Sequence, residues 1–445
     1  MLKSNILEEI ESNYPVETIQ TAEGMPVWPL LRQGIYYAQQ FKEVGYSNKL
    51  RTRNKWQLLK NFFYGIPYLF QLKKFNYLFF NNADKRRPHN ELWYDIFMDA
   101  WADKVGQEQS LFVEWAITSH HSAKEVHSKH VVSDLFLKLI TFKNRLFSNI
   151  ELKNEALIKE ICADFEIPFN YSKTIRNSIA EIKSFYWFFS KVKPKAVFLL
   201  SGFTKVPMVL AAKKLNIPVL EPQHGFIGEG HPFYHAVKKF PDFYPDKLIA
   251  FGAFEKNRGY PSFIFEPANI VPIGSMQMEL IKEEILSETL VEIKSNFSIC
   301  YCVTLQNIQD KAIMEMINKE AVKHRDWLFV IRPKQPNFDL SLYSNEENIK
   351  IFPNHSIYEI LKMCDYNITI FSTTVIEGIF LGAKPILINI DDLPYKYFDL
   401  NSGDVAVLEL GEVILNAHLN KSGTLETEYF KEHYFSNVKE ANLCS

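Results

Sequence analysis

The chain has 445 residues, of which 47% are hydrophobic and 23% are charged, as in folded globular proteins. Its length is enough for two or three domains. A formal net charge of −2 gives no positive field that would favour nucleic acid. The five cysteines are scattered, which argues against a disulfide framework and a zinc site, and no apolar run reaches about 18 residues. We therefore expect a cytoplasmic protein without a membrane-spanning helix.

Residues 1–75 predict a helical N-terminal extension, because apolar side chains such as Ile35 and Tyr36 recur at helical spacing. Residues 49–87 carry ten Lys or Arg and one acid, Asp84, interleaved with aromatic side chains. This pattern is typical of a helix on the inner face of an anionic membrane, so peripheral membrane contact is one hypothesis. A packed helix whose charges face solvent fits the pattern as well.

A first Rossmann-like domain is predicted for residues 76–243. Four histidines, His120, His121, His127 and His130, share a window but lack the pattern of a metal site. A buried-type strand, a helix and a second strand are expected at residues 196–200, 205–215 and 217–220, which is a parallel unit with a right-handed crossover. Further strands are expected at 77–80 and 111–114, and helices at 95–105 and within 120–190.

A second Rossmann-like domain is predicted for residues 244–410, after a link at 240–245 in which two prolines break the periodicity. Residues 411–445 are expected to form a helical tail that packs back on the first domain. Strands are expected at 299–303, 327–331, 349–352, 367–371 and 385–390, with helices at 310–324, 356–364 and 374–381. The predicted fold class is therefore α/β, with two doubly wound parallel sheets facing a cleft.

The first motif is Glu221-Pro-Gln-His-Gly225, directly after the strand that ends at Leu220. Ligands bind beyond the carboxyl ends of the strands in such sheets, so His224 is placed to contact phosphate or to move a proton. A histidine that only holds the loop is the alternative. His231 and His235, in the aromatic loop that follows, are weaker candidates.

In the second motif, Ser372, Thr373 and Thr374 end a predicted strand and begin a predicted helix. Hydroxyls and free N–H groups at a helix N-terminus favour an anion such as phosphate. Glu377 follows about one turn later, where it could accept hydrogen bonds from ribose hydroxyls. Thr374 and Glu377 also have the spacing of a capping box, and both interpretations stay open.

The third motif places two cations, Arg332 and Lys334, after the strand at 327–331. They suit the negative charge of a phosphate or diphosphate, with a surface loop as the alternative. Weaker candidates at the edges of the two sheets are His355, Ser356, Gly252, Gly274 and Ser275.

Several common motifs are missing from the sequence. It contains no GxGxxG before a helix and no GxxxxGK[ST], which argues against dinucleotide oxidoreductases and P-loop NTPases. It contains no GxSxG, which argues against an α/β-hydrolase. An Asp-x-Asp of the kind found in metal-dependent sugar transferases is also missing.

The segments EPQHG, DKLIAFGAF, NIVPIGS and HSIYEILKMCDYNITIFSTTVIEGIFLGAKPILIN together resemble bacterial capsule and lipopolysaccharide glycosyltransferases of GT-B fold. The resemblance covers about residues 195–395 and is weaker over 76–115. Related transferases often carry Arg-x-His-Pro where this chain has Arg332-Pro333-Lys334-Gln335. This departure argues against a CMP-sugar as the donor.

The resemblance implies that the second domain binds a nucleotide-sugar donor, with Gln223 and Gly225 contributing from the first domain. The first domain would hold the acceptor, a surface polysaccharide or a lipid-linked oligosaccharide. Neither metal nor cofactor is expected, because Arg332, Lys334 and the helix N-terminus at Thr373 can stabilise the departing phosphate. The base that deprotonates the acceptor is expected in the first domain, with Glu114 and His224 as the candidates.

Three alternatives stay open at this point. One is a glycerophosphate or sugar-phosphate transferase of the same architecture. Another is a non-catalytic nucleotide-sugar-binding partner in polysaccharide assembly. The third is a sugar 2-epimerase, which needs no acceptor groove.

Overall fold

The computed structural model describes residues 5–44, 55–89, 91–148, 150–228, 231–334, 338–398, 405–412 and 414. The predicted C-terminal tail falls almost wholly outside these residues, and so do the Lys and Arg side chains of residues 49–54. Within the described ranges, no helix combines the length and the apolar character needed to cross a membrane.

The first domain is built on a seven-stranded sheet, and all of its strand pairs are parallel. In spatial order the strands are β11 (Ile270–Pro272), β10 (Lys247–Ala250), β9 (Val219–Pro222), β8 (Ala196–Leu199), β2 (Tyr77–Asn82), β5 (Ser110–Trp115) and β6 (Val131–Ser133). Its helices are α5 (Asp99–Val105), α6 (Leu135–Leu146), α7 (Glu155–Asp164), α8 (Tyr171–Val192), α9 (Val206–Lys213) and α10 (Phe254–Arg258). The strands read as nearly continuous apolar runs because helices cover both faces of such a sheet.

The second domain has a six-stranded parallel sheet. Its strands in spatial order are β14 (Ile349–Lys350), β13 (Trp327–Arg332), β12 (Ile299–Thr304), β15 (Tyr366–Thr369), β16 (Lys384–Asn389) and β17 (Ala406–Glu409). The helices are α13 (Asp310–Lys323), α14 (Ile357–Met363), α15 (Thr374–Leu381) and α16 (Leu393–Tyr397), preceded by α11 (Met276–Glu283) and α12 (Glu288–Ser295).

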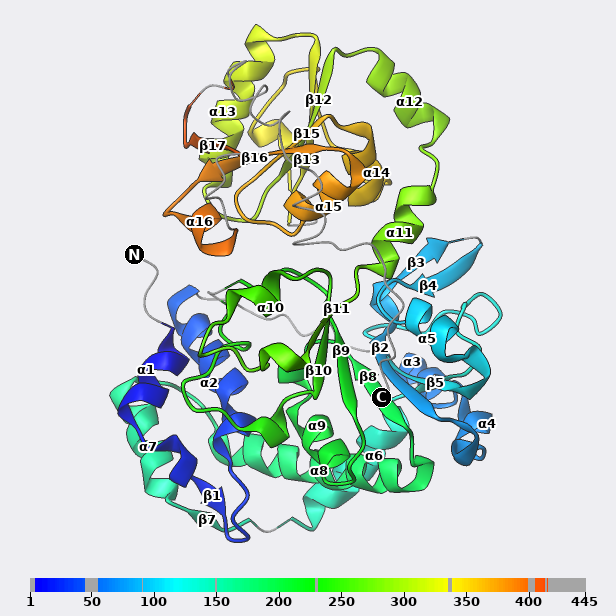
Figure 1. The fold of residues 1–445 in the computed structure, drawn as a ribbon, viewed down its shortest axis with the longest axis vertical. Coiled ribbons are helices and arrows are strands. Elements are labelled where there is room, and N and C mark those ends of the chain that lie inside the picture. Colours follow the sequence, from blue (N-terminus) through cyan, green and yellow to red (C-terminus); the bar gives the residue numbers. More distant parts are fainter. Residues whose placement is uncertain are drawn as a thin grey trace.

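Both sheets have a topological switch point, where the strand order reverses along the chain. In the first sheet it lies between β2 and β8, and in the second between β12 and β15. The second sheet has the strand order of the dinucleotide-binding Rossmann fold. The two domains face each other, one above the other in Figure 1, which confirms the expected GT-B arrangement. Ligands in open α/β sheets bind at such switch points, so the topology defines two places to look for sites.

The helical N-terminal extension comprises α1 (Ile6–Asn13), α2 (Trp28–Val44), α3 (Lys55–Phe62) and α4 (Ile66–Leu69). The first two pack with α7 in a small apolar core at the side of the first domain (Figure 1). The buried Glu11 carboxylate accepts hydrogen bonds from Trp28, Arg32 and the backbone N–H of Val237, so it ties the extension to the loop after β9.

The division of the chain differs from the sequence-based expectation. The expected link at residues 240–245 lies inside the first domain, because β10 and β11 extend the first sheet beyond β9. The chain passes to the second sheet only after Pro272, through α11 and α12. Two short antiparallel strand pairs escaped the sequence analysis, β1 (Gln20–Thr21) with β7 (Leu152–Lys153) and β3 (Arg86–His89) with β4 (Leu92–Asp95).

Candidate functional site

A cavity of about 480 Å³ lies at the switch point of the second sheet, and we call it the C-domain pocket. Its size is in the range of small-molecule sites. It brings together several residues from the second and third sequence motifs. Its polar lining residues are Thr304, Gln306, Arg332, Lys334, Ser372, Thr373 and His231, and its aromatic lining residues are Phe226, Phe371 and Tyr397.

The positive charge of the C-domain pocket comes from Arg332 and Lys334. One terminal nitrogen of Arg332 donates to the carbonyls of Phe352 and His355 at 3.1 and 3.0 Å, which fixes the guanidinium at the end of β13. Partial burial lowers the pKa of Arg332 from its ordinary value, and the group stays charged at neutral pH. Lys334 is exposed at the rim. A fixed fork and a mobile ammonium together suit phosphate oxygens.

Gln306 and Thr304 belong to the C-domain pocket, although the sequence analysis did not select them. The Gln306 carbonyl accepts hydrogen bonds from the backbone N–H of Phe371 at 3.0 Å and the hydroxyl of Thr369 at 3.2 Å. Its amide nitrogen has no partner among the described residues, so it is free to donate to a ligand. The signal that could have found both residues is their position at the end of the central strand β12.

The three adjacent hydroxyl residues have different roles. Ser372 and Thr373 line the C-domain pocket, as expected for phosphate contacts. Thr374 is instead buried: its hydroxyl donates to Thr304 at 3.4 Å and accepts from the Asn367 amide at 3.2 Å. Thr374 therefore holds β12, β15 and α15 together, and the structure does not bring it to the lining of the C-domain pocket.

Glu377 does not line the C-domain pocket. Its carboxylate accepts a hydrogen bond from the Tyr358 hydroxyl at 3.4 Å, and that hydroxyl accepts one from Gln277 at 2.7 Å. Desolvation raises the pKa of Glu377 to about 7. The capping-box interpretation of Thr374 with Glu377 was wrong, because Thr373 is the N-cap of α15 and makes no side-chain cap. A complete capping box forms at the start of α14, between Ser356 and Glu359.

His355 and Ser356 act as structural residues at the start of α14. The His355 carbonyl holds Arg332, and the His355 ring lies 3.2 Å from Glu359. The Ser356 hydroxyl is used by the capping box. Both residues support the C-domain pocket from outside its lining.

The loop after β9 belongs to the first domain and contacts the second. The backbone N–H of Phe226 donates to the Thr373 hydroxyl at 3.2 Å, and Phe226 and His231 form the wall of the C-domain pocket on the side of the first domain. Gly225 lies opposite Thr373, where an added Cβ would stand 3.9 Å from the hydroxyl oxygen. The EPQHG and STT motifs, far apart in the sequence, therefore meet at the cleft.

Gln223 holds this loop, with both hydrogens of its amide nitrogen already donated to protein partners. Its amide nitrogen donates to the Gly225 carbonyl at 3.0 Å and to Glu255 at 2.6 Å, and its carbonyl accepts from the N–H of Phe251 at 2.8 Å. Ser275 caps α11 through a hydrogen bond from the N–H of Met278. Gly274 and Ser275 line only a small void of about 20 Å³ in the first domain, and Gly252 is buried. The structure thus does not bring these four residues to the C-domain pocket.

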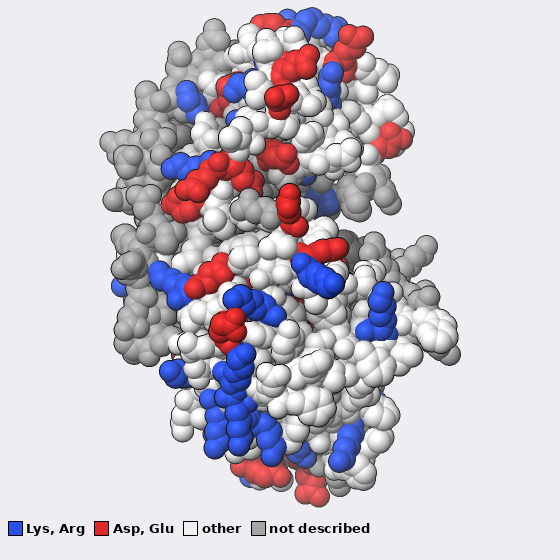
Figure 2. Space-filling view, turned by 90° about the vertical axis from the view of Figure 1, so that its right-hand side faces the viewer, with Lys and Arg blue, Asp and Glu red and all other residues white. Residues whose placement is uncertain are grey.

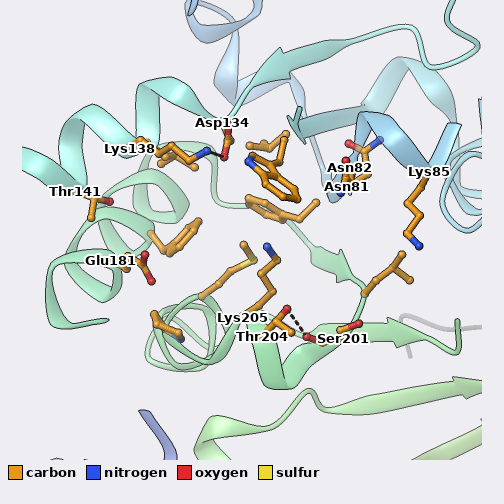
Figure 3. Close-up of a pocket in the computed structure, with 18 of the residues that line it drawn as sticks. Asn81, Asn82, Lys85, Asp134, Lys138, Thr141, Glu181, Ser201, Thr204 and Lys205 are labelled. Carbon is orange, nitrogen blue, oxygen red and sulfur yellow. Dashed lines mark hydrogen bonds and ion pairs between the residues drawn. The ribbon is translucent and has the colours of Figure 1, made fainter. Parts of the chain in front are cut away.

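A second cavity, of about 440 Å³, lies at the switch point of the first sheet, and we call it the N-domain pocket (Figure 3). Its apolar lining comes from strand ends and from α6, α8 and α9, and includes Phe80, Trp115, Leu137, Phe185, Leu200 and Met208. Lys138 is paired with Asp134 at 2.7 Å. Lys205 and Glu181 extend into the cavity, where burial lowers the pKa of the amine and raises that of the carboxyl.

His224 lines the N-domain pocket. Its Nε2 lies 3.2 Å from the Ser201 hydroxyl, and its Nδ1 is buried without a partner among the described residues. Burial, with the charge of Lys85, lowers the pKa of His224 to about 4. The ring is therefore neutral at pH 7, which is the protonation state that a general base starts from.

Glu114 is not available as a base. Its buried carboxylate accepts hydrogen bonds from Arg86 at 2.6 Å and Asn81 at 2.9 Å, and lies 2.8 Å from His120. Burial alone would raise its pKa, but the contacts with His120 and Arg86 lower it to about 2. A carboxylate held this strongly in its ionised form is a poor proton acceptor, so the structure gives no support to Glu114 as the base.

Four further histidines have protein partners. His127 lies 2.9 Å from Asp103, His130 contacts backbone carbonyls, and His121 stacks on Trp93. His235 contacts Ser262 at 2.9 Å, and its carbonyl accepts a hydrogen bond from Arg32. Among the described residues, no group of His, Cys, Asp and Glu is arranged to bind a metal.

The sequence matches no protein-family model and no curated protein sequence. Several solved structures align with about four-fifths of this chain at low identity. The co-structure of S. aureus MnaA with UDP has a TM-score of 0.47 and 11% identity, covering 81% of this chain and 91% of that chain. UDP-GlcNAc 2-epimerase from Neisseria meningitidis, bound to UDP-GlcNAc, has a TM-score of 0.45 and 14% identity, covering 82% of this chain and 94% of that chain. The glycosyltransferase SnogD from Streptomyces nogalater has a TM-score of 0.47 and 13% identity, covering 81% of this chain and 96% of that chain. Likeness this distant says nothing about the activity of this chain.

Proposed function

We propose that the chain is a glycosyltransferase that takes a sugar from a nucleotide-sugar bound in the C-domain pocket. The observation that carries the proposal is the meeting of Arg332, Lys334 and Thr373 around one cavity at the switch point of the second sheet. Two cations and a hydroxyl suit the negative charge and the hydrogen-bond acceptors of a diphosphate. The aromatic rings of Phe226, Phe371 and Tyr397 offer surfaces on which a nucleobase or sugar ring can pack.

The N-domain pocket is the proposed acceptor site. As the acceptor hydroxyl attacks the anomeric carbon, His224 takes its proton, and the bond between the sugar and the phosphate oxygen breaks. The electron pair of that bond passes to the phosphate, whose developing charge is stabilised by Arg332 and Lys334. In this proposal, side chains of the protein take the proton and stabilise the charge on the phosphate. We propose a surface polysaccharide or a lipid-linked oligosaccharide as the acceptor.

The donor site is tested by calorimetry with UDP-, GDP-, dTDP- and CMP-sugars. Arg332→Ala should weaken binding of the preferred donor by about 10- to 100-fold, as expected for the loss of charge-assisted hydrogen bonds. Arg325→Ala is the matched control, because Arg325 precedes the same strand at its opposite end and is paired with Glu346 on the surface. Equal donor affinity in folded Arg332→Ala and Arg325→Ala proteins would contradict the assignment.

Turnover separates the transferase from the alternatives. A transferase releases the nucleoside diphosphate faster when an acceptor is present. An epimerase converts the sugar of the nucleotide-sugar without an acceptor, and a binding partner shows affinity without either reaction. Chromatography of the nucleotide products with and without acceptor extract distinguishes the three results.

A further inference from the structure

The first domain exposes apolar side chains on two neighbouring helices, α3 and α6, which lie against each other. Trp56, Leu59 and Phe63 have the spacing i, i+3, i+7, and so do Leu139, Phe142 and Leu146. Phe63 directly follows α3, and its N–H donates to the Leu59 carbonyl at 3.4 Å, so it continues the last helical turn. The spacing therefore aligns three side chains along one face of each element. All six side chains are about half exposed or more, from 49% for Leu59 to 77% for Trp56. In a water-soluble helix this face would normally be polar.

The charged residues within these two segments are all basic. The sequence contains no Asp or Glu within residues 55–82 or within 135–146. Lys60 and Lys143 are exposed and have no ion pair among the described residues. The Arg145 guanidinium lies 5.2 Å from the centre of the Phe142 ring, so cation and apolar surface are adjacent. In the lower half of Figure 2, Lys and Arg border a broad area of the first domain without charged side chains.

We propose that this surface, the α3–α6 face, docks on a bilayer that contains anionic lipid. Aromatic and aliphatic side chains would enter the boundary between head groups and acyl chains, while lysines and arginines pair with lipid phosphates. The absence of acids from both segments favours anionic lipid over a second copy of this chain. The chain has a net charge of −2, but in a symmetric dimer this basic face would meet the same basic face, and the two would repel each other. The proposal rests on this surface alone and holds whether or not either pocket binds a sugar.

The position of α6 connects this surface with the N-domain pocket. Leu137, Lys138 and Thr141 on another face of α6 line that pocket. A bilayer on the outer face of α6 would therefore lie one helix away from the pocket. This arrangement suits an acceptor whose lipid part stays in the membrane while its sugar enters the protein.

Sedimentation of the full chain with vesicles tests the proposal. At low salt, the wild type should bind vesicles of phosphatidylcholine with phosphatidylglycerol much better than phosphatidylcholine alone, and added salt should weaken binding. The double variant Phe63→Glu, Phe142→Glu should lower vesicle affinity by roughly tenfold or more. Leu342→Glu, at a side chain 77% exposed on the second domain, is the matched control and should bind as the wild type does.

The melting temperatures of the variants should match that of the wild type, because the substituted side chains are exposed. Equal binding of the wild type to neutral and anionic vesicles would overturn the proposal, and so would unchanged binding by the double variant. Light scattering gives a third decisive result. A dimer that the double variant dissociates, without vesicle binding by the wild type, would show that the face is a protein interface.

Discussion

The two pockets occupy equivalent places in two similar sheets, yet their linings differ. The C-domain pocket has hydroxyls, an amide and two cations at the ends of β12, β13 and β15. The N-domain pocket mixes apolar side chains with charges of both signs, namely the ion pair of Lys138 with Asp134, two further lysines and the carboxyl of Glu181. The comparison teaches that the topology determines where a ligand can bind, while a few residues after each strand determine which ligand fits.

The loop that begins at Gln223 links these two places. His224 faces the N-domain pocket, and two residues later Phe226 lines the C-domain pocket. The chain therefore changes from one site to the other within three residues. Substitutions in and around this loop can separate donor binding, turnover and stability, which gives the predictions below.

The largest effect is expected at the buried charges beside the N-domain pocket. Glu114→Ala leaves the Arg86 guanidinium without its closest carboxylate, and breaking a buried pair costs about 3–5 kcal/mol. Chemical denaturation should show this loss, whereas donor affinity of the folded fraction should not change. A variant as stable as the wild type, but inactive, would restore Glu114 as a catalytic base.

The second effect separates the two pockets at His224. His224→Ala should lower turnover by about 100-fold, in the range for general acid–base groups, and should leave donor affinity unchanged. Because the pKa of His224 is lowered to about 4, turnover of the wild type should fall only as the pH drops towards that value. Calorimetry and product release, measured on one preparation, check both parts. Normal turnover in a destabilised variant would make His224 a loop residue.

The third prediction concerns Glu255, which holds Gln223 and thus the connecting loop. Burial raises the pKa of Glu255 from 4.5 to about 7, so its contribution to stability declines as the pH rises from 4.5 to 7 and is constant above that. Glu255→Gln removes this titration. It should therefore stabilise the protein more at pH 8 than at pH 5, by of the order of 2 kcal/mol. Melting curves that show the same difference at both pH values would contradict a buried, titrating carboxyl.

The smallest effect is expected at the neighbouring hydroxyls of the C-domain pocket. Thr373→Val should weaken donor binding by about 1 kcal/mol, the worth of one neutral hydrogen bond, with little change in stability. Thr374→Val should lower stability with little change in donor binding, because its buried hydroxyl forms hydrogen bonds with Thr304 and Asn367. Comparing affinity and melting temperature for the two variants checks the assignment. The reverse pattern would place Thr374 at the ligand.

Much of the fold was predictable because parallel strands are short apolar runs, such as β12 and β13, separated by amphipathic helices. The domain boundary was not predictable, because prolines occur in many loops. Pro241 and Pro245 lie in the loop between β9 and β10, which are neighbouring strands of the first sheet. The strand β6 has only three residues, too few for a periodic signal.

The sequence predicted which strand ends carry the site, but not which side chains face the cavity. The sequence placed Arg332 and Thr373 at an edge where the structure has a cavity. It could not tell Thr373 from Thr374, because the rotation of α15 decides which hydroxyl is buried. It also could not show that Gln223 turns inward to Glu255, or that Arg86 neutralises Glu114. Such contacts join residues distant in the sequence.

The central claim is that a nucleotide-sugar binds in the C-domain pocket. Hydrogen exchange measured by mass spectrometry, with and without the donor chosen by calorimetry, tests it most directly. The account predicts slower exchange in peptides that contain Gln306, Arg332 and residues 371–376, with no change in α6. Protection confined to the N-domain pocket, or no protection at a saturating donor concentration, would contradict it.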